Sequence, residues 1–344
     1  MTPKVSVIMS VHNGEVFLEQ AIDSVLGQSF QEFEFVIVDD ASTDRTWDIC
    51  AECAVYDHRI ILLRNSNNIG LTQSLNRAIE VSKGEYIARQ DADDISVSSR
   101  LEKQVQFLGE NPDVGVVGTW VAYVDEKGKI TGYWRPPTSP EVIKWNLLFG
   151  TCVAHPSVIM RKQLILKERY NPTYRYAQDY DLWLRLSKKT KIANIPEILY
   201  MRRVHPRTIS LMHGQEQKQA VVDIMRKKLT SLLKVAIKER EVMILEGAIT
   251  QKKMRTRQEL RTLIKLIIRV YRAYLREHLR DKSTQRMVAH DVAQKLASVA
   301  VRHVAEMPWE AGMALCSAIT IKPAILRGPW MRHFGIRLLK RHGA

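Results

Sequence analysis

The sequence predicts an α/β fold in residues 1–210, with a mostly parallel sheet flanked by helices, followed by a basic, all-helical region in residues 211–344. Buried-strand patterns alternate with helical patterns through the first 120 residues, which is typical of a doubly wound parallel sheet. From about His213 onward the pattern is helical almost throughout. All of the excess positive charge lies in this later region as well.

The elements of the first part follow from local patterns. Strands are expected where β-branched and other apolar residues run together, at 5–11, 33–38, 59–63 and 86–89. Helices are expected where apolar residues recur at helical spacing, at 15–26, 42–56, 71–82 and 98–108. Ser42 or Thr43 is the expected N-cap of the second helix, and Gly84 follows the third. Further on, the sequence predicts a strand at 114–124, a proline-rich loop at 135–140, a strand at 157–160 and a helix from about Tyr180.

Composition excludes several classes of protein. With 344 residues, 45% hydrophobic and 26% charged, the chain can bury a core and form about two domains. No apolar run reaches the roughly 18 residues of a membrane span. Glu15 and Glu19 lie where a secretory signal would be apolar, and the four cysteines are too scattered for a disulfide framework. We therefore expect a cytoplasmic protein.

The positive charge is confined to the second part of the chain. Residues 1–210 carry 25 Lys and Arg against 26 Asp and Glu, a net charge of −1. Residues 211–344 carry 27 against 11, a net charge of +16. This asymmetry predicts two domains with different partners, divided at residue 210, the second partner being anionic.

The basic region shows a two-sided helical pattern. One face is apolar and carries Leu260, Leu263, Ile264, Ile267, Val270, Tyr271 and Tyr274. The other carries Lys265, Arg269, Arg272 and Arg276. Such helices can lie on an anionic membrane, pack on the first domain with solvated charges, or bind nucleic acid. No aromatic platform or nucleic-acid module is present, so no nucleic acid is expected. Our hypothesis is peripheral attachment to the cytoplasmic face of the inner membrane.

Acidic residues suggest where chemistry takes place. They follow two strands and begin a later helix: Asp39 and Asp40, Asp91, Asp93 and Asp94, and Asp179 and Asp181. Parallel strands deliver their carboxyl ends to one edge of a sheet, so Asp40, Asp91 and Asp93 should converge. Neighbouring carboxylates raise each other's pKa unless a cation neutralises them, and Asp-x-Asp suits Mg²⁺ or Mn²⁺. Asp91 and Asp93 are therefore the expected metal ligands.

Other phosphate-binding chemistries lack their motifs. The chain has no Gly-x-Gly-x-x-Gly after the first strand and no Gly-x4-Gly-Lys-Ser/Thr segment. The loop after the first strand, His12-Asn13-Gly14, contains a single glycine. These absences argue against a dinucleotide dehydrogenase and a P-loop nucleotidase. The remaining possibility is a ligand whose diphosphate is bound through a bridging metal ion.

Seven segments, in this order, resemble family 2 glycosyltransferases of the GT-A fold. They lie at residues 5–14, 36–44, 84–94, 100–104, 155–157, 178–183 and 202–206. The resemblance covers about residues 4–210. It implies an inverting transfer of a sugar from a nucleotide-sugar, most simply a UDP-sugar, with Mn²⁺ or Mg²⁺. The acceptor would be a hydroxyl of a glycan or lipid-linked sugar in cell-surface polysaccharide synthesis.

The resemblance also implies residue roles. Asp179 would be the catalytic base that deprotonates the acceptor hydroxyl. Asp40 would accept a hydrogen bond from the nucleobase, with Asp39 behind it near the ribose or supporting the turn. Asp93 would bind the metal, and Asp91 would contact the ribose or the metal through water. The remaining expected donor-binding residues are Val11, His12, Asn13, Arg89, Ala92 and, near the diphosphate, His205.

The chain departs from the common family pattern at a few positions. Ser10 and His12 stand where a proline and a tyrosine are usual, and Gln178 replaces a glutamate before the expected base. The loss of that neighbouring charge should lower the pKa of Asp179, other things being equal. The Gln-x-x-Arg-Trp signature of processive synthases is absent, which favours a single transfer per binding event.

Two other functions stay open on sequence grounds. A sugar-1-phosphate nucleotidyltransferase would share the sheet and the acidic metal site, but would need a glycine-rich, basic loop after the first strand. A basic membrane or nucleic-acid adaptor with an inactive nucleotide-binding domain would not need Asp40, Asp93 and Asp179, all of which are present.

Overall fold

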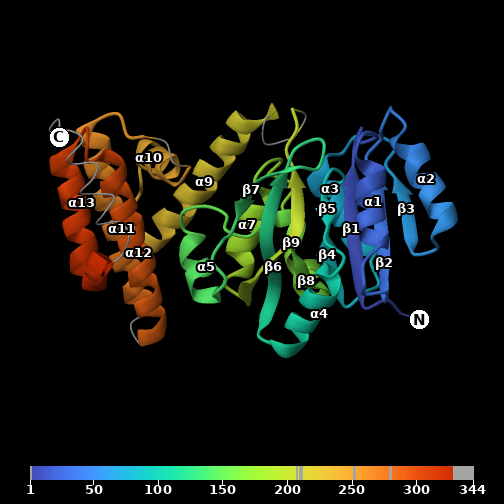
Figure 1. The fold of residues 1–344 in the computed structure, drawn as a ribbon, viewed down its shortest axis with the longest axis horizontal. Coiled ribbons are helices and arrows are strands. Elements are labelled where there is room, and N and C mark those ends of the chain that lie inside the picture. The colour runs from blue at the N-terminus through green and yellow to red at the C-terminus, as the bar shows by residue number, and fades with distance from the viewer. Residues whose placement is uncertain (1, 207, 209–211, 251–252, 279–280, 328–344) are drawn as a thin grey trace. The chain divides into compact units, whose positions relative to one another are not determined.

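A computed structural model describes residues 2–206, 208, 212–250, 253–278 and 281–327 (Figure 1). The chain divides into two compact units, one of residues 1–144 with 151–220 and one of residues 145–150 with 221–344. The division at residue 210 that the charge pattern suggests stays a prediction about how the protein is organised.

The first half of the sheet is parallel, as predicted. Its strands are β1 (Val5–Val11), β2 (Phe33–Asp39), β3 (Ile60–Arg64) and β4 (Tyr86–Arg89), in the spatial order β3-β2-β1-β4. Ile8 of β1 lies beside Val36 of β2 and Arg89 of β4. The ends of β1, β2 and β4 therefore meet at one edge of the sheet, where the sequence places the acids.

The second half of the sheet is mixed. Its strands are β5 (Ile95–Ser96), β6 (Val114–Val124), β7 (Ile130–Trp134), β8 (Ile159–Arg161) and β9 (Lys191–Arg203). β8 is antiparallel to β4 and β6, whereas β9 is parallel to β6 and antiparallel to β5. The sheet is thus less parallel than the sequence suggested, because antiparallel strands extend it beyond β4.

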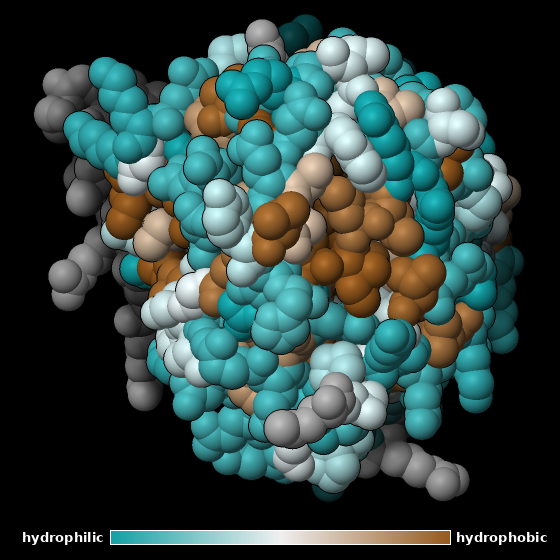
Figure 2. Space-filling model, turned by 90° about the vertical axis from the view of Figure 1, so that its right-hand side faces the viewer, coloured by the Kyte–Doolittle hydropathy of each residue, from teal (hydrophilic) through white to brown (hydrophobic). Residues whose placement is uncertain are grey.

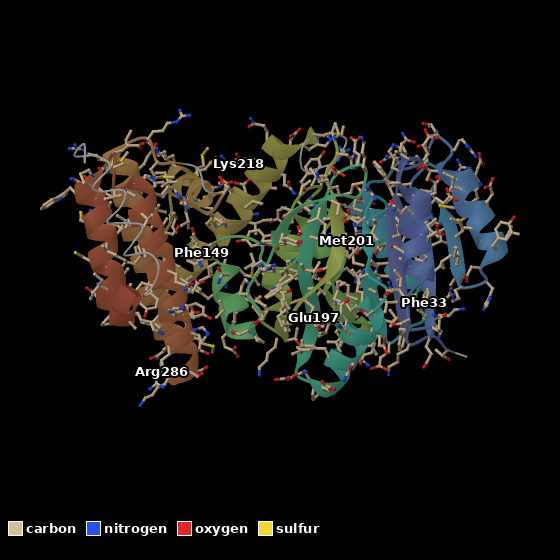
Figure 3. The ribbon with its side chains drawn as sticks, viewed as in Figure 1. Phe33, Phe149, Glu197, Met201, Lys218 and Arg286 are labelled. Carbon is tan, nitrogen blue, oxygen red and sulfur yellow. The ribbon has the colours of Figure 1, made fainter. Side chains whose placement is uncertain are left out.

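The 13-residue strand β9 is absent from the predicted elements. Its pairing with β6 skips from Ile195 to Ile198, so Pro196 and Glu197 form an irregularity in the ladder. A proline and a charged residue at this point break the apolar pattern that identifies strands in a sequence. Figure 3 labels Glu197 and Met201 along this strand, and Met201 pairs with Ile95 of β5.

Helices cover the sheet: α1 (Leu18–Leu26), α2 (Thr46–Tyr56), α3 (Leu71–Val81), α4 (Arg100–Glu110), α6 (Lys162–Glu168) and α7 (Gln178–Leu186), with α5 (Pro140–Asn146) before β8. Four positions of α1 at helical spacing are buried in the core, from Leu18 to Val25. The predicted caps of α2 are wrong. Arg45 precedes its first residue, and the Ser42 hydroxyl instead accepts a hydrogen bond from the backbone N–H of Asn13.

Apolar surface is exposed where α2 and β3 lie. Figure 2 views this side and shows hydrophobic residues gathered near its centre among hydrophilic ones. Val55 and Tyr56 at the end of α2 are 83% and 90% exposed. β3 is the outermost strand of the order, so its outer edge has no neighbouring strand in the described sheet.

The second unit is helical in its described residues. After the later part of α9 (Gly214–Leu233) come α10 (Glu239–Ile249), α11 (Arg257–Glu277), α12 (Lys282–His303), α13 (Pro308–Ile321) and a 3-10 turn (Pro323–Arg327). Trp145 is fully buried in this unit and donates from Nε1 to Asp291 of α12 at 2.8 Å. Among the residues that the structure describes, no helix combines the length and the apolarity that crossing a bilayer requires.

Gly84 packs too closely on β1 to accept a side chain. A Cβ there would lie 2.5 Å from the backbone N of Ser6 and 2.7 Å from the backbone C of Val5. We expect Gly84→Ala to lower the free energy of unfolding by about 1–3 kcal/mol, because a buried strand must move. Gly109→Ala is the matched control, since no atom lies within 4 Å of that Cβ on α4.

The two glycine variants are compared by urea denaturation. The control should be neutral or more stable by up to about 1 kcal/mol, because alanine favours a helix over glycine. Equal stability of the two variants would show that β1 adapts to the added methyl group.

Candidate active site

The loops after β1 and β2 are bound to each other. The backbone N–H of Asp40 donates to the Val11 carbonyl at 2.8 Å. The His12 ring lies with Nδ1 2.9 Å from the Asp40 carbonyl oxygen. The Asn13 side chain accepts a hydrogen bond from the backbone of Thr43 at 2.9 Å. The predicted donor-binding residues of the first loop are therefore positioned beside Asp40.

The buried carboxylate of Asp40 already accepts three hydrogen bonds. They come from Asn65 Nδ2 at 2.7 Å, the N–H of Ile69 at 2.9 Å and the N–H of Gly70 at 2.8 Å. Gly70 has a φ of 85°, a conformation that favours glycine, and it directly precedes α3. A carboxylate offers about four acceptor positions, so about one is left unused.

Asp39 is fully buried behind this carboxylate. It accepts a hydrogen bond from the backbone of Ser42 at 3.1 Å and pairs with Arg64 Nε at 3.0 Å. Of the two roles that the resemblance implies for Asp39, these contacts fit support of the turn.

Three carboxylates gather after β4. One oxygen from each of Asp91, Asp93 and Asp94 lies within 4.8 Å of the others. Asp91 pairs with Arg89 Nη1 at 2.5 Å, and Asp93 lies 2.9 Å from His205 Nε2. Asp94 accepts from the backbone N–H of Arg203 at 2.8 Å, and its other oxygen is buried without a hydrogen bond. Asp94 is thus a third possible metal ligand beside Asp91 and Asp93, which the Asp-x-Asp pattern does not include although Asp94 directly follows Asp93.

The electrostatics of this cluster favour a bound cation. Burial and then the charge of Asp91 raise the pKa of Asp93. Burial, followed by the charges of Asp93 and Asp91, raises the pKa of Asp94 well above its usual range. A divalent cation would relieve this repulsion, and an all-oxygen donor set suits Mg²⁺ or Mn²⁺. The residues present therefore fit such a metal.

The acidic loop also meets the first loop. A Cβ on Gly14 would lie 3.9 Å from the Cβ of Ala92. The predicted positions Val11, His12 and Asn13 are thus close to the loop that carries Ala92 and Asp93. The edge of the sheet brings together residues from β1, β2 and β4, which the sequence predicts from strand topology alone.

Two buried arginines build the floor of the site. Arg89 is fully buried, and burial lowers its pKa, but the charges of Asp91, Tyr170 and Tyr200 together with the hydrogen bond to Asp91 raise the pKa overall. Arg100 of α4 donates to the Arg89 carbonyl at 2.8 Å and to Ser96 Oγ at 2.8 Å. Burial lowers the pKa of Arg100 to about 10. Arg100 holds the backbone of Arg89 in place.

Asp179 is the second residue of α7, after Ala177 with a φ of 60°. Burial raises its pKa, while the backbone N–H of Tyr180 and the charges of Arg202 and Arg89 lower it. The absence of a negative charge at Gln178 was expected to lower the pKa of Asp179, but desolvation outweighs this effect. Arg89 is near enough to act on both Asp91 and Asp179.

His155 is buried beside this helix rather than exposed to a ligand. Its Nε2 lies 2.7 Å from the Tyr170 hydroxyl. Burial, and then the charge of Arg89, lower its pKa well below the usual range, so the ring is neutral. Asp181 pairs with Arg185 at 2.9 Å, one turn along α7, which gives it a structural role.

Known proteins place this chain in a family. The model of glycosyl transferase family 2 matches residues 6–166. The O-antigen biosynthesis glycosyltransferase WbnJ of Escherichia coli is 34% identical over 208 residues, which cover 58% of this chain and 80% of WbnJ. The chain is a family 2 glycosyltransferase. A second relative from Escherichia coli, the UDP-Glc:alpha-D-GlcNAc-diphosphoundecaprenol beta-1,3-glucosyltransferase WfaP, is 30% identical, covering 60% of this chain and 79% of WfaP.

The glycosyltransferase has the GT-A fold. It superimposes on Staphylococcus aureus TarS residues 1–349 in complex with UDP-GlcNAc with a TM-score of 0.54 and 17% identity. The match covers 94% of this chain and 92% of that one, and 55% of a longer TarS chain. Family membership confirms the resemblance seen in the sequence motifs and favours glycosyl transfer over nucleotidyl transfer.

His205 reaches the acidic cluster of this glycosyltransferase from the end of β9. Its ring also lies 5.0 Å from that of Phe17, and Arg203 lies over the same phenylalanine at 4.5 Å. Asp93 and His205 are 112 positions apart in the sequence. The motif at 202–206 marks His205, but only the pairing of β9 brings it to Asp93.

Proposed function

We propose that this glycosyltransferase moves a sugar from a UDP-sugar, with inversion, to a hydroxyl of a lipid-linked glycan at the cytoplasmic face of the membrane. The observation that carries the proposal is that Arg89 lies close both to Asp91 of the acidic cluster and to Asp179. Asp91 pairs with this arginine, and the charge of the arginine lowers the pKa of Asp179. Glycosyl transfer needs carboxylates for two purposes: ligands for the metal ion that binds the donor diphosphate, and a base for the acceptor hydroxyl. The acidic cluster and Asp179 supply one each in this proposal.

Asp91 and Asp93, with Asp94 beside them, would hold the metal ion. A bound cation supplies Lewis-acid stabilisation of the charge that develops on the leaving diphosphate. The remaining acceptor position of Asp40 would take the nucleobase N–H, and the exposed His12 ring could stack at the same edge. The name of WfaP, which gives a UDP-Glc donor, supports a uridine nucleotide.

Asp179 would take the proton of the acceptor hydroxyl. Burial raises its pKa, which makes the carboxylate a stronger base, while the charges of Arg202 and Arg89 help to keep it ionised. Attack from the side opposite the diphosphate inverts the anomeric carbon. The β linkage in the name of WfaP supports inversion, since glucose is α-linked in UDP-glucose.

The acceptor class follows from the relatives. WfaP is named for a sugar on diphosphoundecaprenol, and WbnJ for O-antigen biosynthesis. An acceptor carried on a lipid would place the enzyme at a membrane surface. In this proposal residues 1–210 perform catalysis and residues 211–344 contact the membrane.

A nucleotide panel tests the donor and the metal together. Thermal unfolding of the full chain is followed with UDP, GDP, CMP, TDP and ATP, each with and without Mn²⁺. UDP at 100 times its dissociation constant should stabilise the protein by about 2.7 kcal/mol, and only when Mn²⁺ is present. GDP binding without UDP binding would contradict a UDP-sugar donor. Pyrophosphate release from a nucleoside triphosphate would instead indicate a nucleotidyltransferase.

A further inference from the structure

A surface pocket lies within the helical unit. It has a volume of about 800 Å³ and is lined by the end of α9 and by one side of α11. This volume lies in the range of small-molecule sites. Its apolar lining comes from Leu232 and Leu233 of α9 and from Ile268 and Ala273 of α11.

The charged lining of this pocket is almost entirely basic. Lys265, Arg269, Arg272 and Arg276 follow each other at spacings of four, three and four, so they form one stripe along α11. Lys234, the residue directly after α9, adds a fifth cation and has a φ of 54°. We call these five residues the basic stripe. The pocket contains one acid, Glu277.

The basic stripe has no internal partner among the described residues. Each of its side chains is exposed, and none has an ion pair or side-chain hydrogen bond there. Some other cations of the unit are paired, such as Arg261 with Glu310 and Lys295 with Asp291. The carboxyl end of α9 faces the stripe, but a helix terminus supplies only about half a negative charge. Most of the stripe's positive charge is therefore uncompensated.

The opposite side of α11 explains why the stripe stays at the surface. Leu260, Leu263, Ile264, Ile267 and Val270 are buried in the unit, as the sequence pattern predicts. This face fixes the rotation of the helix, so the cations must point away from the core. Exposed cations around an apolar floor match a ligand with anionic and apolar parts.

We propose that this pocket binds the phosphate of anionic phospholipid headgroups at a membrane surface. The basic stripe contacts the phosphates, and the apolar floor receives the first carbons below the headgroup. Nucleic acid is the less favoured occupant, because no aromatic side chain lines the pocket for base stacking. The inference deepens the proposed membrane location and does not depend on the donor or the metal.

Vesicle flotation of the full chain tests the proposal. Vesicles of phosphatidylcholine alone are compared with vesicles containing phosphatidylglycerol, at low and at physiological salt. A charge close to an anionic surface contributes about fivefold in binding, so Arg269→Gln, Arg272→Gln and Arg276→Gln together should weaken binding on the order of 100-fold. The wild type should float with the anionic vesicles and not with the neutral ones.

The matched control removes the same charge elsewhere in the unit. Arg240, Arg257 and Arg286 are exposed, have no ion pair among the described residues and do not line the pocket. Figure 3 labels Arg286, on α12. The triple Arg→Gln control should bind vesicles at most a few-fold more weakly than the wild type.

Three outcomes would overturn the proposal. Equal losses in both triple variants would mean that diffuse charge, not this pocket, attracts the membrane. Inorganic pyrophosphate binding to the stripe without vesicle binding would mean a soluble anion is the ligand. Tighter binding of a random oligonucleotide than of anionic vesicles would indicate nucleic acid. UDP binding, measured in the same variants, should not change, so failure here is distinct from failure of the proposed transfer reaction.

Discussion

Asp179→Asn is expected to lower kcat by roughly 10²–10⁴-fold while UDP still binds in the presence of Mn²⁺. The amide keeps the shape of the side chain but cannot accept the acceptor's proton. Activity is measured as UDP released from the UDP-sugar in the presence of a lipid-linked sugar. Loss of kcat with retained nucleotide binding separates a missing base from a misfolded site.

The pH profile gives a second readout of the same residue. A base must be ionised to act, so kcat/KM of the wild type should fall as pH drops through the pKa of Asp179. Burial raises that pKa, so the fall should begin above the ordinary aspartate range near 3.9. The Asp179→Asn variant should lack this acid limb.

Asp181→Asn serves as the control, because Asp181 pairs with Arg185 and not with the site. It should retain wild-type kcat. A kcat above one tenth of the wild-type value in Asp179→Asn would place the base elsewhere. An equal loss in both variants would point to damage of α7 rather than to chemistry.

Asp93→Asn is expected to remove the stabilisation that UDP and Mn²⁺ give together. A neutral amide is a poor ligand for a hard divalent cation, and Asp93 is the carboxylate nearest His205 in the cluster. The loss should approach the full 2.7 kcal/mol of the wild type at 100 times its dissociation constant. Thermal unfolding and calorimetry with UDP and Mn²⁺ both measure it.

The ligand-free Asp93→Asn protein should be at least as stable as the wild type. Burial and the charge of Asp91 raise the pKa of Asp93, so its ionised form is unfavourable in the folded state without a cation. Wild type treated with a chelator should behave like the variant towards UDP. Asp113→Asn is the control, since this exposed aspartate pairs with Lys191 on the surface. Retained Mn²⁺-dependent UDP binding in Asp93→Asn would remove Asp93 from the metal site.

The proposed base and the proposed metal site share one buried arginine. Arg89 pairs with Asp91 and acts on Asp179, while Arg100 holds its backbone. We therefore expect donor binding and ionisation of Asp179 to be electrostatically linked: a cation bound at Asp91 would offset its negative charge, so the net potential at Asp179 would become more positive and favour its carboxylate.

Local sequence patterns were enough to predict the parallel half of the sheet and the position of its acids. β1 and β4 have the predicted bounds, and those of β2 and β3 are within one residue. The reason is that a buried parallel strand appears in the sequence as a continuous apolar run. Parallel topology also places the residues after the carboxyl end of each strand at the same edge of the sheet. The apolar face of α11 was equally readable, because it repeats with the helical period.

Contacts between residues far apart in the chain could not be predicted from local patterns. The irregularity at Pro196 hid β9 from any local pattern, and with it the approach of His205 to Asp93. Local composition likewise gave no sign that Arg89 would be fully buried, or that Asp94 would keep an oxygen without a hydrogen bond. The four cations that α11 gives to the basic stripe were visible as one helix face, but the fifth cation and the pocket need the end of α9 beside α11. Periodicity reports which side of an element is buried, whereas pKa shifts, ion pairs and pockets depend on which distant element packs there.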